Sequence, residues 1–313
     1  MFFYEIADKV KILGRGALTK DGLEADWSAA GFELALEGKG VLTLTVDASV
    51  PTYFRAFFDG EPELERTYVP QGESKVKFYL AEGSHTFRLV KSTSVRDGYV
   101  NFTELTFDGE LLPAPAPRKK YIEFVGVSYA CGSGVLGKAK DAVNKRYHDA
   151  TLAYPYLVAE ALDADLSVAA VGGAGIVNSY NASIIPPCYL CRGPIRNPDV
   201  RYDFTRRCPD LVFMDVGAND GGRGTTNEEF YNELYRFSKE ILELNKGCKL
   251  MFQLHPRYAA QIEQVADRLL EEGYPIYRMK YTWPKMLGAA KHPNVEEHKK
   301  LAEEIITAVK EVL

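Results

Sequence analysis

The chain has 313 residues, of which 46% are hydrophobic and 26% are charged, and its formal net charge is −5. This length predicts about two globular domains with an ample core. Without a basic excess, neither nucleic acid nor an anionic membrane surface is an expected partner. No apolar run approaches the roughly 20 residues of a membrane-spanning helix.

The first residues, "MFFYEIADKV", carry Glu5 and Asp8 and lack the basic and apolar regions of a signal peptide. We therefore expect a cytoplasmic chain. Its five cysteines are odd in number and scattered, which favours reduced thiols. Cys188 and Cys191 form a C-x-x-C pair, but no second pair follows at a similar spacing, so we expect no metal site.

The first third of the chain alternates hydrophobic and polar residues with the period of a β-strand, from Phe32 to Phe107. Asp-Gly, Glu-Gly and Gln-Gly pairs separate the short strands, and no helical pattern lies between them. Residues 1–112 are therefore predicted to form a β-sandwich or jelly roll. The alternating prolines of "LLPAPAPRKK" predict an extended linker over residues 113–120.

The remaining residues, 121–313, alternate strand-like and helical patterns. The predicted strands are Tyr121–Val127, Leu166–Val171, Leu211–Val216, Lys249–Leu254 and Pro275–Met279, and the predicted helices are Ala150–Asp163, Asn227–Leu244, Tyr258–Glu272 and Val295–Leu313. Continuous apolar strands that alternate with helices are typical of a parallel sheet in an α/β fold. Ligands of such folds bind beyond the carboxyl ends of the strands.

Polar and small residues follow most of these strand ends. They include Ser128, the glycines of "AVGGAGIVNSYN" (Gly172, Gly173 and Gly175), Asn219 and Asp220 of "MDVGANDGG", His255 of "FQLHPRY", and His292 ahead of the last helix. Acyl transfer needs a hydroxyl nucleophile, a base, and donors that stabilise an oxyanion. Ser128, His292, and the amides of Gly175 and Asn219 could supply these groups from one edge of the sheet.

The order of these blocks resembles that of the SGNH (GDSL-type) hydrolases. "FVGVSYACGSG" is similar to the serine block, "VGGAGIV" to the glycine block, "VGANDGG" to the asparagine block, and "HPNVEEHKKLAEEI" to the histidine block. The preceding β-rich region makes the chain resemble carbohydrate esterase family 2 in particular, over nearly its whole length. The resemblance implies a jelly roll followed by a three-layer, flavodoxin-like α/β domain.

Carried onto this sequence, the resemblance implies a serine esterase that removes O-acetyl groups from an oligosaccharide through an acyl-enzyme. Ser128 would be the nucleophile and His292 the general base. The backbone amides of Ser128 and Gly175 and the side chain of Asn219 would form the oxyanion hole. Asp220 would serve the structure of its loop. No cofactor is implied, the partner would be an acetylated sugar, and the oligomeric state is not predicted.

Two positions depart from the family pattern. Val127 stands where the serine block normally has aspartate, and Ala289 and Ala290 stand where an aspartate normally precedes the histidine. These departures leave open an alternative, a degenerate SGNH protein that binds a glycan without hydrolysing it. Acyl transfer to an acceptor other than water would use the same residues.

Aromatic and polar residues near the expected cleft are candidate substrate contacts. They are Trp283, Tyr281, Tyr189 and His255, because aromatic faces commonly bind sugar rings. Ordinary packing beneath a loop is an equally good explanation of the aromatic residues, and a structural role is the better explanation of His255. His298 falls within the predicted last helix and is expected to be solvated.

Overall fold

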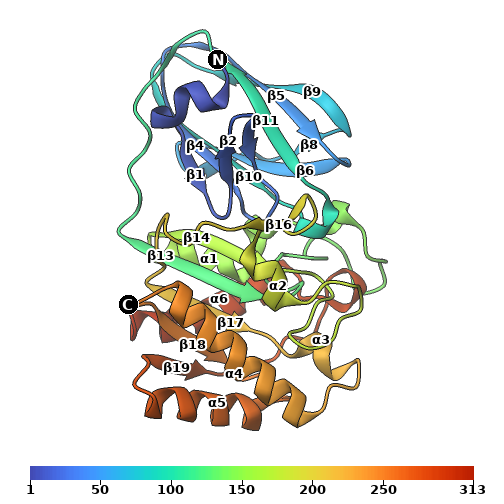
Figure 1. The fold of residues 1–313 in the computed structure, drawn as a ribbon. Coiled ribbons are helices and arrows are strands. Elements are labelled where there is room, and N and C mark those ends of the chain that lie inside the picture. Colours follow the sequence, from blue (N-terminus) through green and yellow to red (C-terminus); the bar gives the residue numbers. More distant parts are fainter.

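The computed structural model describes all residues, 1–313, and has a β-rich part and an α/β part. The β-rich part lies above the α/β part in Figure 1, and an extended segment connects them along one side. This segment joins β12 (Glu110–Leu111) to β13 (Lys120–Gly126) without a helix or strand between them. The division into residues 1–112, 113–120 and 121–313 stays a prediction.

The β-rich part consists of two antiparallel sheets. One has the order β1 (Lys11–Leu13), β4 (Gly31–Glu37), β10 (Ser84–Lys91), β6 (Thr52–Phe58) and β7 (Glu61–Pro62), with β12 on β4 and β8 (Thr67–Val69) on β6. The other has the order β2 (Ala17–Thr19), β3 (Gly22–Glu24), β11 (Val100–Thr106), β5 (Gly40–Ala48) and β9 (Gly72–Leu80). A short 3₁₀ helix, η1 (Phe3–Lys9), precedes them. The predicted all-β architecture is confirmed; the jelly-roll topology stays a prediction.

The α/β part contains a five-stranded parallel sheet. Its order is β14 (Ala164–Ala170), β13, β17 (Leu211–Asp215), β18 (Lys249–Gln253) and β19 (Ile276–Met279). Numbered by sequence within the sheet, this is 2-1-3-4-5, the flavodoxin-like order. The predicted parallel sheet is therefore confirmed. The strand order reverses between β13 and β17, and ligands bind at such a reversal.

Helices cover both faces of this sheet, as the three-layer prediction requires. The helices α1 (Tyr154–Ala161) and α6 (Val295–Lys310) contact each other on one face, and α4 (Asn227–Leu244) and α5 (Ala259–Glu271) on the other. Alternate side chains of each strand enter the two apolar layers: Phe124 packs with the α1 side and Val125 with the α4 side. None of the helices combines the length and hydrophobicity that crossing a lipid bilayer requires.

Several short elements do not appear in the sequence-based prediction. They are α2 (Ile185–Leu190), the hairpin of β15 (Cys191–Gly193) and β16 (Asn197–Arg201), α3 (Ala218–Gly221), and four 3₁₀ turns: η2 (Val95–Asp97), η3 (Lys145–Tyr147), η4 (Ala150–Leu152) and η5 (Ala289–Lys291). Most of them lie in connections that pass over the carboxyl ends of the parallel strands or against the β-rich part. They shape the surroundings of the site.

The two parts are joined by a buried arginine. Arg15, between β1 and β2, is 1% exposed and forms an ion pair with Glu123 of β13, with 3.0 Å between Nε and Oε1. Its guanidinium lies over the rings of Tyr189 and Tyr202, at 4.2 and 4.4 Å from their centroids. Trp27 adds a hydrogen bond from its indole N–H to the carbonyl of Arg192. The hydrophobic core also runs continuously from the β-sheets to the α4 face of the parallel sheet.

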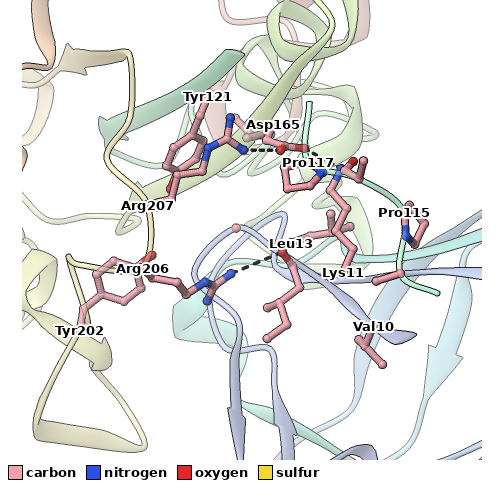
Figure 2. A pocket seen from close by; sticks show the side chains of 15 residues that line it. Val10, Lys11, Leu13, Pro115, Pro117, Tyr121, Asp165, Tyr202, Arg206 and Arg207 are labelled. Carbon is pink, nitrogen blue, oxygen red and sulfur yellow. Dashed lines mark hydrogen bonds and ion pairs between the residues drawn. The ribbon is translucent and has the colours of Figure 1, made fainter. Parts of the chain in front are cut away.

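A cavity of about 400 Å³ lies where the linker meets both parts (Figure 2). It is at the amino ends of β13 and β14, opposite to Ser128. Its charged side chains pair with one another, because Asp165 binds both Lys11 and Arg207. The guanidinium of Arg206 donates to backbone carbonyls of the β-rich part. This cavity therefore belongs to the junction between the two parts.

Candidate active site

A cleft of about 370 Å³ opens at the carboxyl ends of β13 and β17, where the strand order reverses. Its lining brings together residues from four segments that follow strands and from the β-rich part: Ser94, Arg96, Asp97, Ser128, Ser133, Val143, His148, Gly172, Gly173, Tyr180, Asn219 and His292. The structure thus gathers Ser128, Asn219 and His292 in one cleft. Gly175, Trp283, Tyr281, Tyr189 and His255 are not among its lining residues.

The loop after β13 carries Ser128 and is held by glycine-dependent contacts. Gly132 has φ +66° and lies so close to the backbone of Asp149 that a Cβ would collide with its carbonyl oxygen at 2.2 Å. Gly134 has φ +73° and makes a similar approach to Ala289, whose N–H donates to its carbonyl at 2.8 Å. The serine loop is therefore fastened directly to the histidine loop.

Val127 has a packing role. It is 1% exposed and belongs to the core that continues into the β-sheets. A carboxylate at this position would be buried in apolar surroundings, where an unpaired charge is costly. The serine loop is held instead by the contacts of Gly132 and Gly134.

His292 is oriented by a backbone carbonyl. Its Nδ1 lies 3.0 Å from the carbonyl oxygen of Ala289, so Nδ1–H donates and Nε2 is left as the basic nitrogen. The turn that aims this carbonyl contains two non-glycine residues in the left-handed region, Ala290 with φ 52° and Lys291 with φ 59°. Such conformations cost free energy and persist where surrounding contacts impose them. The carbonyl of Ala289 thus takes the place of the aspartate that normally precedes the histidine.

Burial lowers the pKa of His292, an effect that the hydrogen bond to Ala289 opposes. The ring also packs edge-on against Tyr129, with 5.6 Å between the ring centroids. An imidazole with a lowered pKa stays neutral at neutral pH, which is the state a general base needs. Ser128 Oγ makes no hydrogen bond in this structure, and catalytic hydrogen bonds often form only when the substrate is bound.

The glycine loop after β14 is braced by Asp220. Its buried carboxylate accepts hydrogen bonds from the backbone N–H groups of Ile176, Val177 and Asn178, at 2.8–3.2 Å. Desolvation raises the pKa of Asp220, and these hydrogen bonds lower it. Asp220 therefore shapes the loop, in the role that the resemblance implied.

The prediction that Gly175 is an oxyanion donor is wrong in this structure. Its N–H donates to the carbonyl of Asn178 at 2.8 Å, and its Cα faces the carboxylate of Asp220. Gly173 lines the cleft instead and has φ +75°, and its N–H has no acceptor within the protein. The N–H of Ser128 is also without an acceptor. These two amides are free for a ligand oxygen.

Asn219 lies in the short helix α3, in the connection that follows β17. Its side-chain amide donates to the carbonyl of Ala174 at 2.8 Å, which fixes the amide group and leaves its second N–H for a ligand. The cleft therefore presents a serine hydroxyl, a neutral imidazole, and three N–H donors. This set can form and stabilise a tetrahedral intermediate of acyl transfer.

The predicted aromatic contacts separate into buried and exposed residues. Tyr189 is 0% exposed and binds Glu123 through its hydroxyl, so the prediction that it contacts substrate is wrong. Tyr281 is 3% exposed and donates to Asp215. The rings of both tyrosines are buried in the hydrophobic core, so neither ring faces the cleft. Trp283 is 37% exposed and packs against Tyr129, whose ring in turn contacts His292 of the cleft.

Two histidines are also buried. His255 is 8% exposed, and its ring packs against Trp283, with 4.9 Å between the centroids. Burial lowers its pKa to about 4. It supports Trp283 and does not line the cleft. The expectation that His298 is solvated is wrong, because its side chain is 0% exposed. It lies on the face of α6 that packs against α1 and accepts a hydrogen bond from the N–H of Tyr154.

The structure adds cleft residues that sequence patterns did not indicate. Arg96, Asp97 and His148 lie outside the four blocks, two of them in the β-rich part. The segment around Arg96 and Asp97 has no motif, and "NKRYHDA" around His148 has neither a helical nor a strand period. No local signal could have brought these residues to the cleft, because long-range contacts place them there.

Comparisons with known proteins agree with this arrangement. A family model described as carbohydrate esterase 2 N-terminal matches residues 12–115. The cellulase/esterase CelE of Acetivibrio thermocellus is 32% identical over 206 residues, which are 64% of this chain and 25% of CelE. This chain thus spans about a quarter of CelE. An acetylxylan esterase / glucomannan deacetylase of Cellvibrio japonicus is 26% identical over 306 residues, covering 90% of this chain and 83% of the relative.

The fold has a solved counterpart that extends over both parts. The structure of a family two carbohydrate esterase from Clostridium thermocellum in complex with cellohexaose covers 96% of this chain and 98% of its own. Its TM-score is 0.90 at 24% identity, so it shows the shared two-part fold. The family model over residues 12–115, the curated relatives and the shared fold together support the assignment of the chain to carbohydrate esterase family 2, among the SGNH hydrolases.

Proposed function

We propose that the protein is a serine esterase that removes O-acetyl groups from carbohydrate. Ser128 attacks the acetyl carbonyl, and His292 takes the hydroxyl proton and passes it to the departing sugar oxygen. Water then hydrolyses the acetyl-enzyme with the same base. The amides of Ser128 and Gly173 and the side chain of Asn219 stabilise the oxyanion in both steps.

One observation carries this proposal: the cleft gathers Ser128, Gly173, Asn219 and His292 at the strand-order reversal, with His292 oriented by Ala289. The alternative of a non-catalytic glycan binder drew on Val127 in the serine block and on the missing aspartate before His292. The carbonyl of Ala289 supplies an orienting acceptor for His292, and the contacts of Gly132 and Gly134 hold the serine loop, so both features are compatible with catalysis. Curated relatives named acetylxylan esterase and glucomannan deacetylase support an acetylated plant-type polysaccharide or its oligosaccharides as the substrate.

The test is release of acetate from acetylated xylo-oligosaccharides. Wild-type protein should release it, and Ser128→Ala should not, because the nucleophile is gone. Equal rates for the two proteins would refute the proposal. We further propose a cytoplasmic location, because all five cysteines are unpaired thiols. Detection of the protein in the culture medium of its native cells, with none inside them, would refute this location.

Replacement of Asn219 by alanine tests the oxyanion assignment. We expect kcat to fall about 10²–10³-fold with little change in KM, because the lost donor acts mainly on the charged intermediate. Steady-state kinetics on p-nitrophenyl acetate would measure this effect. Asn101→Ala is a suitable control, since Asn101 lies in the β-rich part and bonds only to the carbonyl of Asp21. Unchanged kcat in Asn219→Ala would rule out this donor.

The pH dependence of kcat/KM should reflect the lowered pKa of His292. The base is active when neutral, and a pKa below the ordinary value of 6.5 keeps it neutral at lower pH. The acid limb of the profile should therefore have an apparent pKa below 6.5. Measurement of kcat/KM between about pH 4 and 8 would locate it. An acid limb above 6.5 would contradict the burial of this imidazole.

A further inference from the structure

The cleft contains a second imidazole that the esterase mechanism does not use. His148 Nδ1 lies 2.8 Å from Oδ2 of Asp97, and both residues line the same cleft as Ser128 and His292. The side chain of His148 is 6% exposed, and its Nε2 makes no hydrogen bond within the protein. His292 is held by a backbone carbonyl, whereas His148 is held by a carboxylate.

The β-rich part builds the carboxylate side of this pair. Asp97 ends the 3₁₀ turn η2, and its Oδ2 also accepts from the N–H of Ser94 at 3.0 Å. Beneath the turn, the fully buried ammonium of Lys91 donates to the carbonyls of Asp26, Ser94 and Gly98. A buried cation with three acceptors fixes the backbone on both sides of Asp97. The carboxylate is thus presented by a rigid turn.

The segment that carries His148 is held by the β-rich part as well. Arg66 donates from Nη1 to the carbonyl of His148 at 2.6 Å, and Arg55 pairs with the neighbouring Asp149 at 2.7 Å. The N–H of Ala150 donates to the carbonyl of Ser92 at 2.8 Å. Contacts on three consecutive residues, all to the β-rich part, leave the imidazole little freedom to move.

The tautomer of His148 follows from its partner. A carboxylate accepts, so Nδ1–H of His148 donates to Asp97, and in this tautomer Nε2 is an acceptor. Nε2 cannot donate to an oxyanion in this state, but it can accept the O–H of an alcohol. Desolvation raises the pKa of Asp97, but the hydrogen bond from His148 and the nearby charge of Lys91 lower it, and the net effect is a lowered pKa. Asp97 therefore stays ionised as an acceptor.

We propose that His148, positioned by Asp97, is a specificity-determining residue that accepts a hydrogen bond from a free hydroxyl of the sugar bearing the acetyl ester. The inference rests on the proposed esterase function and names what the cleft recognises beyond the ester. A volume of about 370 Å³ is typical of pockets that hold a small ligand. His148 and Ser128 are thus in position to contact the same bound sugar.

A site built to bind a hydroxyl discriminates against substrates that lack it, because its buried polar group is then left unpaired. Acetylated xylo-oligosaccharide has free hydroxyls beside its esters, and p-nitrophenyl acetate has none. We expect His148→Ala to lower kcat/KM for the sugar ester about 10–100-fold more than for p-nitrophenyl acetate, mainly through KM. His148→Gln, whose amide oxygen can accept the same bond, should recover part of the loss.

The ratio of the two kcat/KM values is measured in one preparation, so partial unfolding of a variant does not alter it. The matched control is His85→Ala. His85 forms the same kind of pair, with 2.8 Å between its Nδ1 and Asp59 Oδ2, but lies outside the cleft. The ratio should stay at the wild-type value in this control.

Two outcomes would overturn the inference. A parallel loss on both substrates in His148→Ala would make His148 a base or a purely structural residue, and an unchanged kcat/KM on both substrates would exclude contact with the sugar hydroxyl. Failure of the proposed function is seen separately, in the wild-type protein. If wild-type protein hydrolyses neither substrate, the esterase function fails and the inference falls with it.

Discussion

Replacing His292 by alanine should lower kcat for acetyl-ester hydrolysis by at least about 10³-fold, on both sugar esters and p-nitrophenyl acetate. The imidazole is the base that the hydroxyl of Ser128 needs in order to attack, and it is the acid that protonates the departing oxygen. Both substrates require the base, for the hydroxyl of Ser128 and for the water that hydrolyses the acetyl-enzyme, although p-nitrophenolate departs without a proton. The loss should therefore appear in kcat on each, in contrast to the KM effect expected for His148.

The same variant distinguishes the two imidazoles of the cleft. His85→Ala serves as the control for general effects of removing a histidine, because His85 lies in the β-rich part beside Asp59. If His292→Ala lost less than about tenfold while His148→Ala lost activity on both substrates, the roles of the two histidines would be reversed. Steady-state kinetics on p-nitrophenyl acetate is sufficient to decide between these assignments.

Replacing Arg15 by alanine should lower the free energy of unfolding by about 3–5 kcal/mol, the usual cost of breaking a buried ion pair. Arg15 and Glu123 have side chains that are 0% and 3% exposed, so water cannot solvate the carboxylate that remains. Ser167 and Tyr189 still donate to Glu123, but neither carries a positive charge. The variant also loses the contact of the guanidinium with the ring of Tyr189.

Equilibrium unfolding in urea would measure this change. The control is Arg236→Ala on the exposed face of α4, where ion pairs with Glu233 and Glu240 should contribute less than about 1 kcal/mol. The double variant Arg15→Met with Glu123→Gln removes both charges and should recover part of the stability. A cost for Arg15→Ala no larger than that for Arg236→Ala would contradict the role of this pair in joining the two parts.

Much of the fold could be predicted because its signals are local. The period of hydrophobic residues predicted α4 as Asn227–Leu244, and the structure has the same bounds. A capping box between Thr226 and Glu229 fixes its first turn. The strands of the parallel sheet were also found within a few residues, since each is a short apolar run between polar segments. The α2 helix was not predicted, because Pro186 and Pro187 stand in its first turn and obscure the helical pattern.

The site could be predicted only to the level of its blocks. Three glycines follow β14, and the sequence does not show which N–H is free; the long-range contacts of Gly175 with Asn178 and Asp220 decide it. The acceptor for His292 is a backbone carbonyl, which any residue could supply. His148 and Asp97 are 51 residues apart, and the packing of the β-rich part against the α/β part brings them together.

The burial of Tyr189 is another feature that the sequence could not predict, because it depends on long-range packing. An aromatic residue after a proline fits a sugar-binding loop and a core position equally well by sequence. The structure places its ring beside Arg15 and its hydroxyl on Glu123. Tyr189 therefore packs around the buried ion pair that joins the two parts. Sequence patterns identify residue types suited to a task, whereas burial decides which of them are available for it.

Covalent labelling with a serine-directed fluorophosphonate tests the central claim most directly. We expect the intact wild-type protein to gain the mass of one adduct, mapped to Ser128, with no adduct in Ser128→Ala and much slower labelling in His292→Ala. Such a result requires an activated serine hydroxyl at this position. Labelling at another residue, or esterase activity that persists in Ser128→Ala, would contradict the account.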